Sequence, residues 1–565
     1  MGQRKRFQPD HPLIHPTLIY TDIIPPTMRH AIAVLFIAAV TISACGTSPS
    51  IWGVPATPTP DSPLPDTPLI DPFVVQDAPI IFPTSTTPPS IATEAAQTPP
   101  PPAAGVTLEP TLDIPTLDSA PFLYYAQSGD MLSAVAKRFG VDEAEIISDA
   151  DLTRTTLIDP GTLLVIPNRI NEPTTPNIQL IPDSEIVFSA TALDFDTEAY
   201  VKEQNGYLSS FRDYLGSTGW IAGHDAIDRL AIENSINPRL LLALLEFESR
   251  WVRGQPIDLL HTEFPMGFND YHYKGMSVQM VWAINNMAIA YYGWRAGTIT
   301  HLEFPDGSKL RLDPRLNAGT VAIQYLFSRL HSQSQWAQII NPDSGFPALF
   351  EEMFGDPWAR AELVEPLFPP SLNQPPLVLP FEPGVKWSFT GGPHNGWGQI
   401  NPNIYGRSHS VFAAIDFAPA AEKSGCIPTT TWVTAAAPGL VVRSENGVVM
   451  VDLDGDGFEQ TGWNLLYLHI AEKNRVPAGT WLEANDRIGH ASCEGGVSTG
   501  THLHFARKYN GEWVTADGPI PFIMDGWRVV AGEKAYEGKL VRGGQEIIAD
   551  PLSQAWSNII RDENE

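Results

Sequence analysis

The segment GTHLHF at residues 500–505 contains two histidines, His502 and His504, in otherwise apolar or small surroundings. Side chains alternate between the two faces of an extended strand, so both imidazoles point to one face while Leu503 and Phe505 point to the other. Neutral imidazole is the commonest protein ligand for metals, and two imidazoles on one sheet face can share a zinc site. The alternative is a strand with two solvated histidines. The segment therefore predicts a β-strand beside a metal site.

Residues upstream of this segment can complete such a site. A catalytic zinc site needs three protein ligands and an open fourth position, and a carboxylate is a usual ligand type. Asp416 lies in the apolar segment AAIDFAP, which is an unusual place for an unpaired charge. His394 follows Gly391 and Gly392 in WSFTGGPHNGWG, where the glycines allow a tight backbone that aims the side chain inward. A further histidine, His469, ends the apolar segment LLYLHI.

These motifs resemble the zinc endopeptidases of the lysostaphin and beta-lytic type, a LytM-like family that cuts peptide bridges in bacterial cell walls. The family pattern has an early His and Asp, a YxH-like strand and a terminal HxH whose second His is a ligand. The resemblance implies that zinc is held by His394, Asp416 and His504. It also implies that His469 and His502 are the catalytic residues that flank the reacting water.

The resemblance covers roughly a third of the chain. The interval between His394 and Asp416 is longer than expected for the beta-lytic branch, and it contains His409 in GRSHSVFAAID. His409 is therefore a rival ligand, although the glycines before His394 match the family better. We expect the metallopeptidase domain at residues 384–555, followed by a tail at 556–565, and preceded by a Pro-rich linker at 368–383.

Short β patterns dominate this C-terminal domain, separated by Gly, Pro and Asn, so we expect a mainly antiparallel sheet with hairpins. One turn, DLDGDG, begins at Asp452 and copies the start of a calcium loop. Its twelfth position is Trp463 instead of the bidentate Glu that calcium requires. A hairpin turn is the better interpretation of this segment.

Composition limits the classes of protein that this chain can belong to. Its 565 residues exceed what one hydrophobic core usually supports, so several domains are expected. A formal net charge of −29 argues against binding to nucleic acid, whose phosphates it would repel. Of three cysteines, Cys426 and Cys493 lie in Gly-containing segments of a domain expected outside the cytoplasm. We expect them to form a disulfide, with two free buried thiols as the alternative.

The N-terminal segment, residues 1–45, is interpreted as a lipoprotein signal peptide. Its apolar run AIAVLFIAAVTISA is short for a membrane span but suits a signal-peptide core. The run ends in a sequence that resembles a bacterial lipobox, which implies cleavage before Cys45 and lipid attachment to its thiol. An uncleaved anchor helix is the alternative, and Met28 is a candidate start. Residues 46–120 are rich in Pro and Thr and predict an extended, disordered tether.

Residues 121–170 have a strand–helix–helix–strand pattern, and SGDMLSAVAKRFGV with GTLLVIP resembles a lysin-motif domain. That family binds glycans that contain N-acetylglucosamine. The position usually filled by Asn is Asp149 or Asp151 here, which weakens the case for glycan binding more than the case for the fold. A small structural domain without a ligand is the alternative.

After a linker at residues 171–199, the segment 200–367 is helical and rich in aromatic residues. Its NPRLLLALLEFES resembles the helix of lysozyme-like lytic transglycosylases that carries the catalytic acid, which would be Glu248. A carboxylic acid in an apolar cleft can protonate a glycosidic oxygen. The Gly-Met-Gln motif of that family is not visible, and PMGFND occupies its region. Alternatively, Glu246 and Glu248 are ordinary helix-surface acids.

The sequence therefore predicts a multidomain protein: a small βααβ lysin-motif domain, an α-helical lysozyme-like middle domain and a mainly antiparallel β metallopeptidase domain. We expect a cell-wall hydrolase, lipid-anchored outside the cytoplasm to the bacterial membrane, that uses zinc to cleave peptide bonds of peptidoglycan. Two other functions stay open. One is a non-catalytic peptidoglycan-binding scaffold or hydrolase activator, and the other is cleavage of glycan strands through Glu248.

Overall fold

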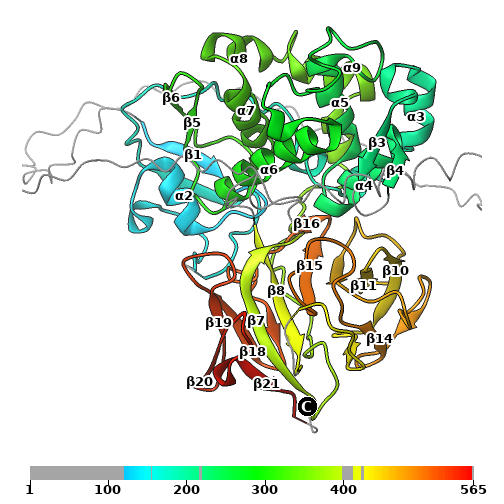
Figure 1. The fold of residues 1–565 in the computed structure, drawn as a ribbon. Helices are drawn as coiled ribbons and strands as arrows, with labels where there is room; N and C mark the ends of the chain where they lie inside the picture. The colour runs from blue at the N-terminus through cyan, green and yellow to red at the C-terminus, as the bar shows by residue number, and fades with distance from the viewer. Residues whose placement is uncertain (1–119, 154, 216–218, 398–410, 422–424, 563–565) are drawn as a thin grey trace, which may run out of the picture. The chain divides into compact units, whose positions relative to one another are not determined.

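A computed structural model describes residues 120–153, 155–215, 219–397, 411–421 and 425–562 (Figure 1). These residues all belong to one compact unit, residues 109–565. The predicted signal peptide with Cys45, nearly all of the Pro-rich tether and the rival ligand His409 lie outside the described residues. None of the helices within the described ranges is long and apolar enough to cross a membrane.

The lysin-motif segment forms a two-stranded antiparallel sheet with one α-helix. Strand β1 (Phe122–Tyr125) pairs with β2 (Leu163–Ile166), and α2 (Leu132–Phe139) lies between them in sequence. The apolar positions of α2 are buried, as their helical spacing predicts. The helix ends at Gly140, whose φ of 68° suits a residue without Cβ. The expected second helix is a single turn of 3-10 helix, η2 (Glu143–Glu145).

The middle domain is built around the buried helix α5 (Pro238–Ser249). Asn237 caps it by accepting a hydrogen bond from the backbone N–H of Arg239 at 3.0 Å, and Pro238 occupies the first turn, as the sequence predicts. The other α-helices and strands of this domain are α3 (Thr197–Gln204), β3 (Arg212–Leu215), β4 (Gly219–Ala222), α4 (Gly223–Asn234), α6 (Met276–Arg295), β5 (His301–Glu303), β6 (Lys309–Arg311), α7 (Ala318–Leu330), α8 (Gln333–Ile339), α9 (Phe346–Phe354) and α10 (Pro357–Ala361).

Both segments expected to be linkers contribute to a core. Leu180 and Ile181, within the expected linker 171–199, are buried among the helices of the middle domain. Leu379 and Phe381, within the Pro-rich segment 368–383, are buried in the core of the C-terminal domain. The reason is that apolar side chains flank the prolines, and each provides apolar area that a neighbouring core can bury.

The C-terminal domain contains a nine-stranded antiparallel sheet, in which the order is β13-β10-β11-β12-β15-β8-β7-β21 and β16 pairs with β15. A second, four-stranded sheet has the order β17-β18-β19-β20. The strands of the large sheet are β7 (Lys386–Asn395), β8 (Phe412–Pro419), β10 (Gly439–Glu445), β11 (Val448–Asp452), β12 (Trp463–Leu468), β13 (Trp481–Leu482), β15 (Leu503–Tyr509), β16 (Glu512–Trp513) and β21 (Asn558–Ile560). The others are β9 (Trp432–Thr434), β14 (Arg487–His490), β17 (Ile523–Met524), β18 (Trp527–Ala531), β19 (Gly538–Arg542) and β20 (Gln545–Ile548).

The Asp-rich turn connects β11 and β12, which pair in register from Val448 opposite Leu468 to Asp452 opposite Asn464. The carboxylate of Asp452 is fully buried and accepts a hydrogen bond from the backbone N–H of Gly457 at 2.9 Å. This hydrogen bond joins the two sides of the turn. The structure thus agrees with the prediction of a hairpin turn.

Candidate metal centre

Three neighbouring strands of the large sheet bring the predicted ligands together. His394 lies near the end of β7, Asp416 on β8 and His504 on β15. In the register of the sheet, His504 is opposite Asp416, and His394 is opposite Ala414, which lies two residues before Asp416 and therefore on the same face of β8. Residues that are directly opposite on paired antiparallel strands project to the same face, so the sheet itself aligns the three side chains.

The three ligand atoms lie close together in the interior. His394 Nε2 is 3.1 Å from His504 Nδ1 and 3.2 Å from Asp416 Oδ1. His504 Nδ1 is 3.4 Å from the same carboxylate oxygen. All three residues are buried, and their exposed fractions are at most 7%. Two imidazoles and a carboxylate converging in this way could hold one metal ion.

Backbone carbonyls fix which nitrogen of each ring carries the proton. His394 Nδ1 lies 2.8 Å from the carbonyl oxygen of Gly392, and His504 Nε2 lies 3.0 Å from that of Gly396. A nitrogen that faces a carbonyl oxygen must donate, so the other nitrogen of each ring, when the ring is neutral, has a free lone pair. Those lone pairs point at each other and at Asp416. This is the arrangement of a metal-ligating histidine whose second nitrogen is held by an outer partner.

The unsatisfied carboxylate oxygen of Asp416 also favours a bound cation at this site. Asp416 Oδ1 is buried and accepts no hydrogen bond from any described residue. A buried carboxylate oxygen that accepts no hydrogen bond is costly. A divalent cation between these atoms would satisfy all three. The donor set of two nitrogens and one carboxylate oxygen suits zinc in a catalytic site.

His469 and His502 lie beside the three candidate ligands. Their rings are 4.4 Å apart, and His502 Nε2 is 3.7 Å from Asp416 Oδ1. Each Nδ1 faces a backbone carbonyl at 2.8 Å, that of Glu494 for His469 and that of Gly500 for His502. His469 directly follows β12 and has a φ of 66°, a conformation that side chains rarely adopt. The structure therefore groups all five predicted residues at one end of adjacent strands.

Electrostatics keep this cluster in the protonation states that ligation requires. Burial alone would raise the pKa of Asp416, but His394 and His502 outweigh it and hold that pKa well below its usual range. Burial, together with the neighbouring His502 and His504, lowers the pKa of His469 to about 3. Burial also lowers the pKa of His504. The carboxylate is ionised and these two imidazoles are neutral near pH 7.

The two glycines before His394 are required by close packing. A Cβ at Gly391 would contact Asp416 Oδ2, and a Cβ at Gly392 would collide with the backbone carbonyl of Glu537. The segment around Glu537 also supplies Tyr536, whose ring stacks on His394 with centroids 4.1 Å apart. Sequence reasoning missed Tyr536, because the segment GEKAYEG has no motif that marks it. Tyr536 is far from the candidate ligands in the sequence, so the sequence does not indicate that it lies beside them in the fold.

A disulfide joins Cys426 to Cys493, across a separation of 67 residues. The hydroxyl of Ser498 lies 3.4 Å from Cys493 Sγ and 3.3 Å from His502 Nδ1. The residues around Cys426 hold the turn before β15. Thr501 donates from its backbone N–H to the carbonyl of Gly425 at 3.1 Å and from its hydroxyl to the carbonyl of Ile427 at 2.6 Å. Since His502 is the next residue, the disulfide constrains the position of one predicted catalytic side chain.

Glu248 lies far from this centre in sequence, on the buried helix α5 of the middle domain. Its side chain is buried, and its Oε1 is 2.9 Å from Nε2 of His331. The structure therefore excludes a surface position for Glu248, which was the alternative interpretation. Glu246 is buried as well and accepts from the backbone N–H groups of Val252 and Arg253 at 3.0 and 2.8 Å.

Three known family models match parts of the chain. Residues 124–167 match the LysM domain model, residues 179–368 match the model of the LasA N-terminal domain, and residues 425–516 match peptidase family M23. The chain thus contains a LysM domain and a peptidase M23 domain. The middle region is helical, and its match is to the N-terminal domain of LasA. That it is lysozyme-like stays a prediction.

Curated relatives match parts of the chain. Protease LasA from Pseudomonas aeruginosa (strain UCBPP-PA14) is 27% identical over 364 residues, which cover 61% of this chain and 77% of LasA. Beta-lytic metalloendopeptidase from Lysobacter enzymogenes is 26% identical over 162 residues, which cover 28% of this chain and 83% of that protein. Among solved structures, the M23 metalloprotease pseudoalterin is 22% identical and covers 33% of this chain and 99% of its own, with a TM-score of 0.26.

Proposed function

We propose that this protein is a zinc-dependent endopeptidase that cleaves peptide bonds of peptidoglycan, held outside the cytoplasm by a lipid on Cys45. The observation that carries the proposal is the buried cluster of His394, Asp416 and His504, in which three electron-pair donors converge within 3.4 Å. His504 lies within residues 425–516, which match peptidase family M23, and this match supports peptide hydrolysis as the reaction.

When bound, zinc supplies a Lewis acid that polarises the scissile carbonyl and lowers the pKa of water towards neutrality. The protein's own residues supply proton transfer and orientation. His502 and His469 lie on one side of the ligands, with their Nδ1 atoms fixed by backbone carbonyls. Their Nε2 atoms are therefore the ones that can accept the proton of water, donate to the leaving amine or stabilise the oxyanion.

The rest of the chain favours a polymeric substrate. The LysM domain supports binding to glycans that contain N-acetylglucosamine, and the Pro-rich segment would let the folded domains reach the wall from a lipid-anchored Cys45. A second attachment point raises the local concentration of the peptidase at its substrate. A non-catalytic scaffold would need the same binding parts, but it would have no use for a complete set of ligands and two flanking histidines.

The products of digestion test this proposal. The purified chain, incubated with peptidoglycan, is expected to release new peptide amines without new glycan reducing ends. A chelator is expected to lower amine release by about 10³-fold or more, and added zinc should restore it. New reducing ends that persist in the chelator would instead assign the activity to Glu248. Binding to the wall without either product would identify a scaffold.

A further inference from the structure

The hairpin that follows His504 on β15 is embedded in the middle domain. Its turn residue Gly511 packs so closely on the carbonyl of Phe188 that a Cβ there would collide with it. Gly511 accepts a hydrogen bond from the hydroxyl of Ser235 at 2.6 Å. The backbone N–H of Trp513 donates to the hydroxyl of Tyr292 on α6 at 3.2 Å. Glu512 lies between these contacts and points into the middle domain.

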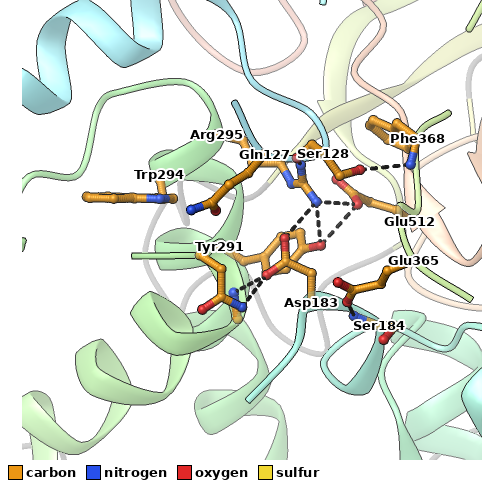
Figure 2. A network of polar contacts seen from close by, with 12 residues as sticks. Gln127, Ser128, Asp183, Ser184, Tyr291, Trp294, Arg295, Glu365, Phe368 and Glu512 are labelled. Carbon is orange, nitrogen blue, oxygen red and sulfur yellow. Dashed lines mark hydrogen bonds and ion pairs between the residues drawn. The ribbon is translucent and has the colours of Figure 1, made fainter. Parts of the chain in front are cut away.

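Arg295, the last residue of α6, is the centre of a buried polar network at this junction (Figure 2). Its Nη2 donates to Glu512 Oε2 at 3.0 Å, to Asp183 Oδ2 at 3.1 Å and to the hydroxyl of Tyr291 at 2.9 Å. Tyr291 in turn donates to Glu512 Oε2 at 3.0 Å. One guanidinium thus joins the peptidase strand β16 to the helical domain.

The LysM domain reaches the same guanidinium. Arg295 Nη1 donates to the carbonyl of Ser128, and the absence of a side chain at Gly129 makes room for it. The hydroxyl of Ser128 accepts a hydrogen bond from the backbone N–H of Phe368 at 2.8 Å, and the ring of Phe368 faces the Arg295 guanidinium at 5.4 Å. Three domains and the connecting segment therefore meet at one side chain.

The charges at this junction do not balance if every acid is ionised. Glu365 lies beside the network and accepts from the backbone N–H of Ser184 at 2.8 Å (Figure 2). Three carboxyl groups, those of Asp183, Glu365 and Glu512, surround one cation, Arg295. Asp183 is further satisfied by the side-chain amide of Asn317 at 2.8 Å and the N–H of Gly319 at 2.7 Å. The other titratable groups that face the network from α6 are the phenols of Tyr291 and Tyr292.

We propose that this network is a pH-sensitive clasp, in which Arg295 and Glu512 hold the LysM, middle and peptidase domains together in acid and loosen this junction as the pH rises through neutrality. This inference goes beyond the proposed peptidase activity, and its test does not depend on that activity. The group that titrates is Glu512, because it is fully buried, comes from a different domain than its partners and shares its cation with Asp183.

The direction follows from burial. Burial raises the pKa of Glu512 to about 7, Arg295 opposes this shift, and Asp183 and Glu365 add to it. If the junction opens, Glu512 enters water and regains its ordinary pKa of 4.5. The closed form therefore binds the extra proton. Its advantage is fully present below about pH 4.5 and is lost progressively as the pH rises through about 7.

Hydrogen–deuterium exchange across pH tests the clasp in the full chain. After correction for intrinsic exchange rates, the protection of residues 126–130 and 506–514 in the wild type is expected to fall roughly 70-fold between about pH 5 and about pH 8. Glu512→Gln, a neutral isostere of the protonated acid, is expected to keep the junction protected at both values. Glu533→Gln, at an exposed glutamate of the same domain, should behave like the wild type.

Strands β7 and β8 and helix α5 serve as internal references, since global unfolding would expose them together with the junction. Arg295→Gln is expected to leave the junction open at both pH values while these references stay protected. Protection of the wild-type junction that is independent of pH would overturn the proposal, as would an identical pH response in Glu512→Gln. If Glu512→Gln does not fold, the wild-type and Arg295→Gln profiles decide by the same criteria.

Discussion

Alanine at His502 or at His469 is expected to lower kcat/KM for peptide release by about 10²- to 10⁴-fold while zinc stays bound. Both rings lie beside the ligands, at 4.4 Å from each other, but neither belongs to the set of three converging donors. Loss of either would remove a proton-transfer or oxyanion contact and leave the metal in place. Steady-state kinetics and the zinc content of each variant measure the two effects separately.

A matched control for these variants is His272→Ala, because His272 is an exposed histidine of the middle domain. It should change neither kcat/KM nor zinc content. Loss of zinc in His502→Ala or His469→Ala would show that the histidine is a ligand. Unchanged kinetics in both variants would remove these residues from the mechanism.

Replacing both Cys426 and Cys493 by serine is expected to lower the free energy of unfolding of the peptidase domain by about 4 kcal/mol. The chain-entropy account gives this magnitude for the 67-residue loop that the disulfide closes. For a domain of this size, the midpoint of thermal unfolding should fall by about 8–16 °C. Activity should fall as well, because Gly425 and Ile427 anchor Thr501, the residue before His502.

The third cysteine provides the control for this experiment. Cys45→Ser leaves both disulfide partners intact and should unfold at the wild-type midpoint. A reducing agent should lower the midpoint of the wild type and of Cys45→Ser, but not that of the double variant. A double variant that unfolds at the wild-type temperature would contradict a stabilising role for the disulfide.

The strand content of the C-terminal domain could be predicted because its signals are local. Alternation places His502 and His504 on one face, and glycines separate the short strands. The start of α5 could also be predicted, since the N-cap residue Asn237 and the first helical residue Pro238 are adjacent in the sequence. The second helix of the lysin motif was overestimated, because EAE between two turns is long enough for a single 3-10 turn only.

The three residues proposed as ligands could be selected from the sequence for a different reason. Asp416 is conspicuous as a charge within an apolar strand, and His394 follows two glycines that close packing requires. Tyr536 and the junction around Arg295 could not be found in this way. Asp183, Arg295 and Glu512 are separated by more than 100 residues from one another, so only the packing of whole domains brings them together.

The measurement that tests the central claim most directly is the zinc content of the purified chain, determined alongside peptide release from peptidoglycan, for the wild type and His504→Ala. We predict close to one zinc per wild-type chain, with both zinc and peptide release lost in the variant, because His504 Nδ1 is one of three converging donors. A wild-type chain that binds no zinc and releases no peptide, or a His504→Ala variant that keeps both, would contradict the assignment of this cluster as a catalytic zinc site.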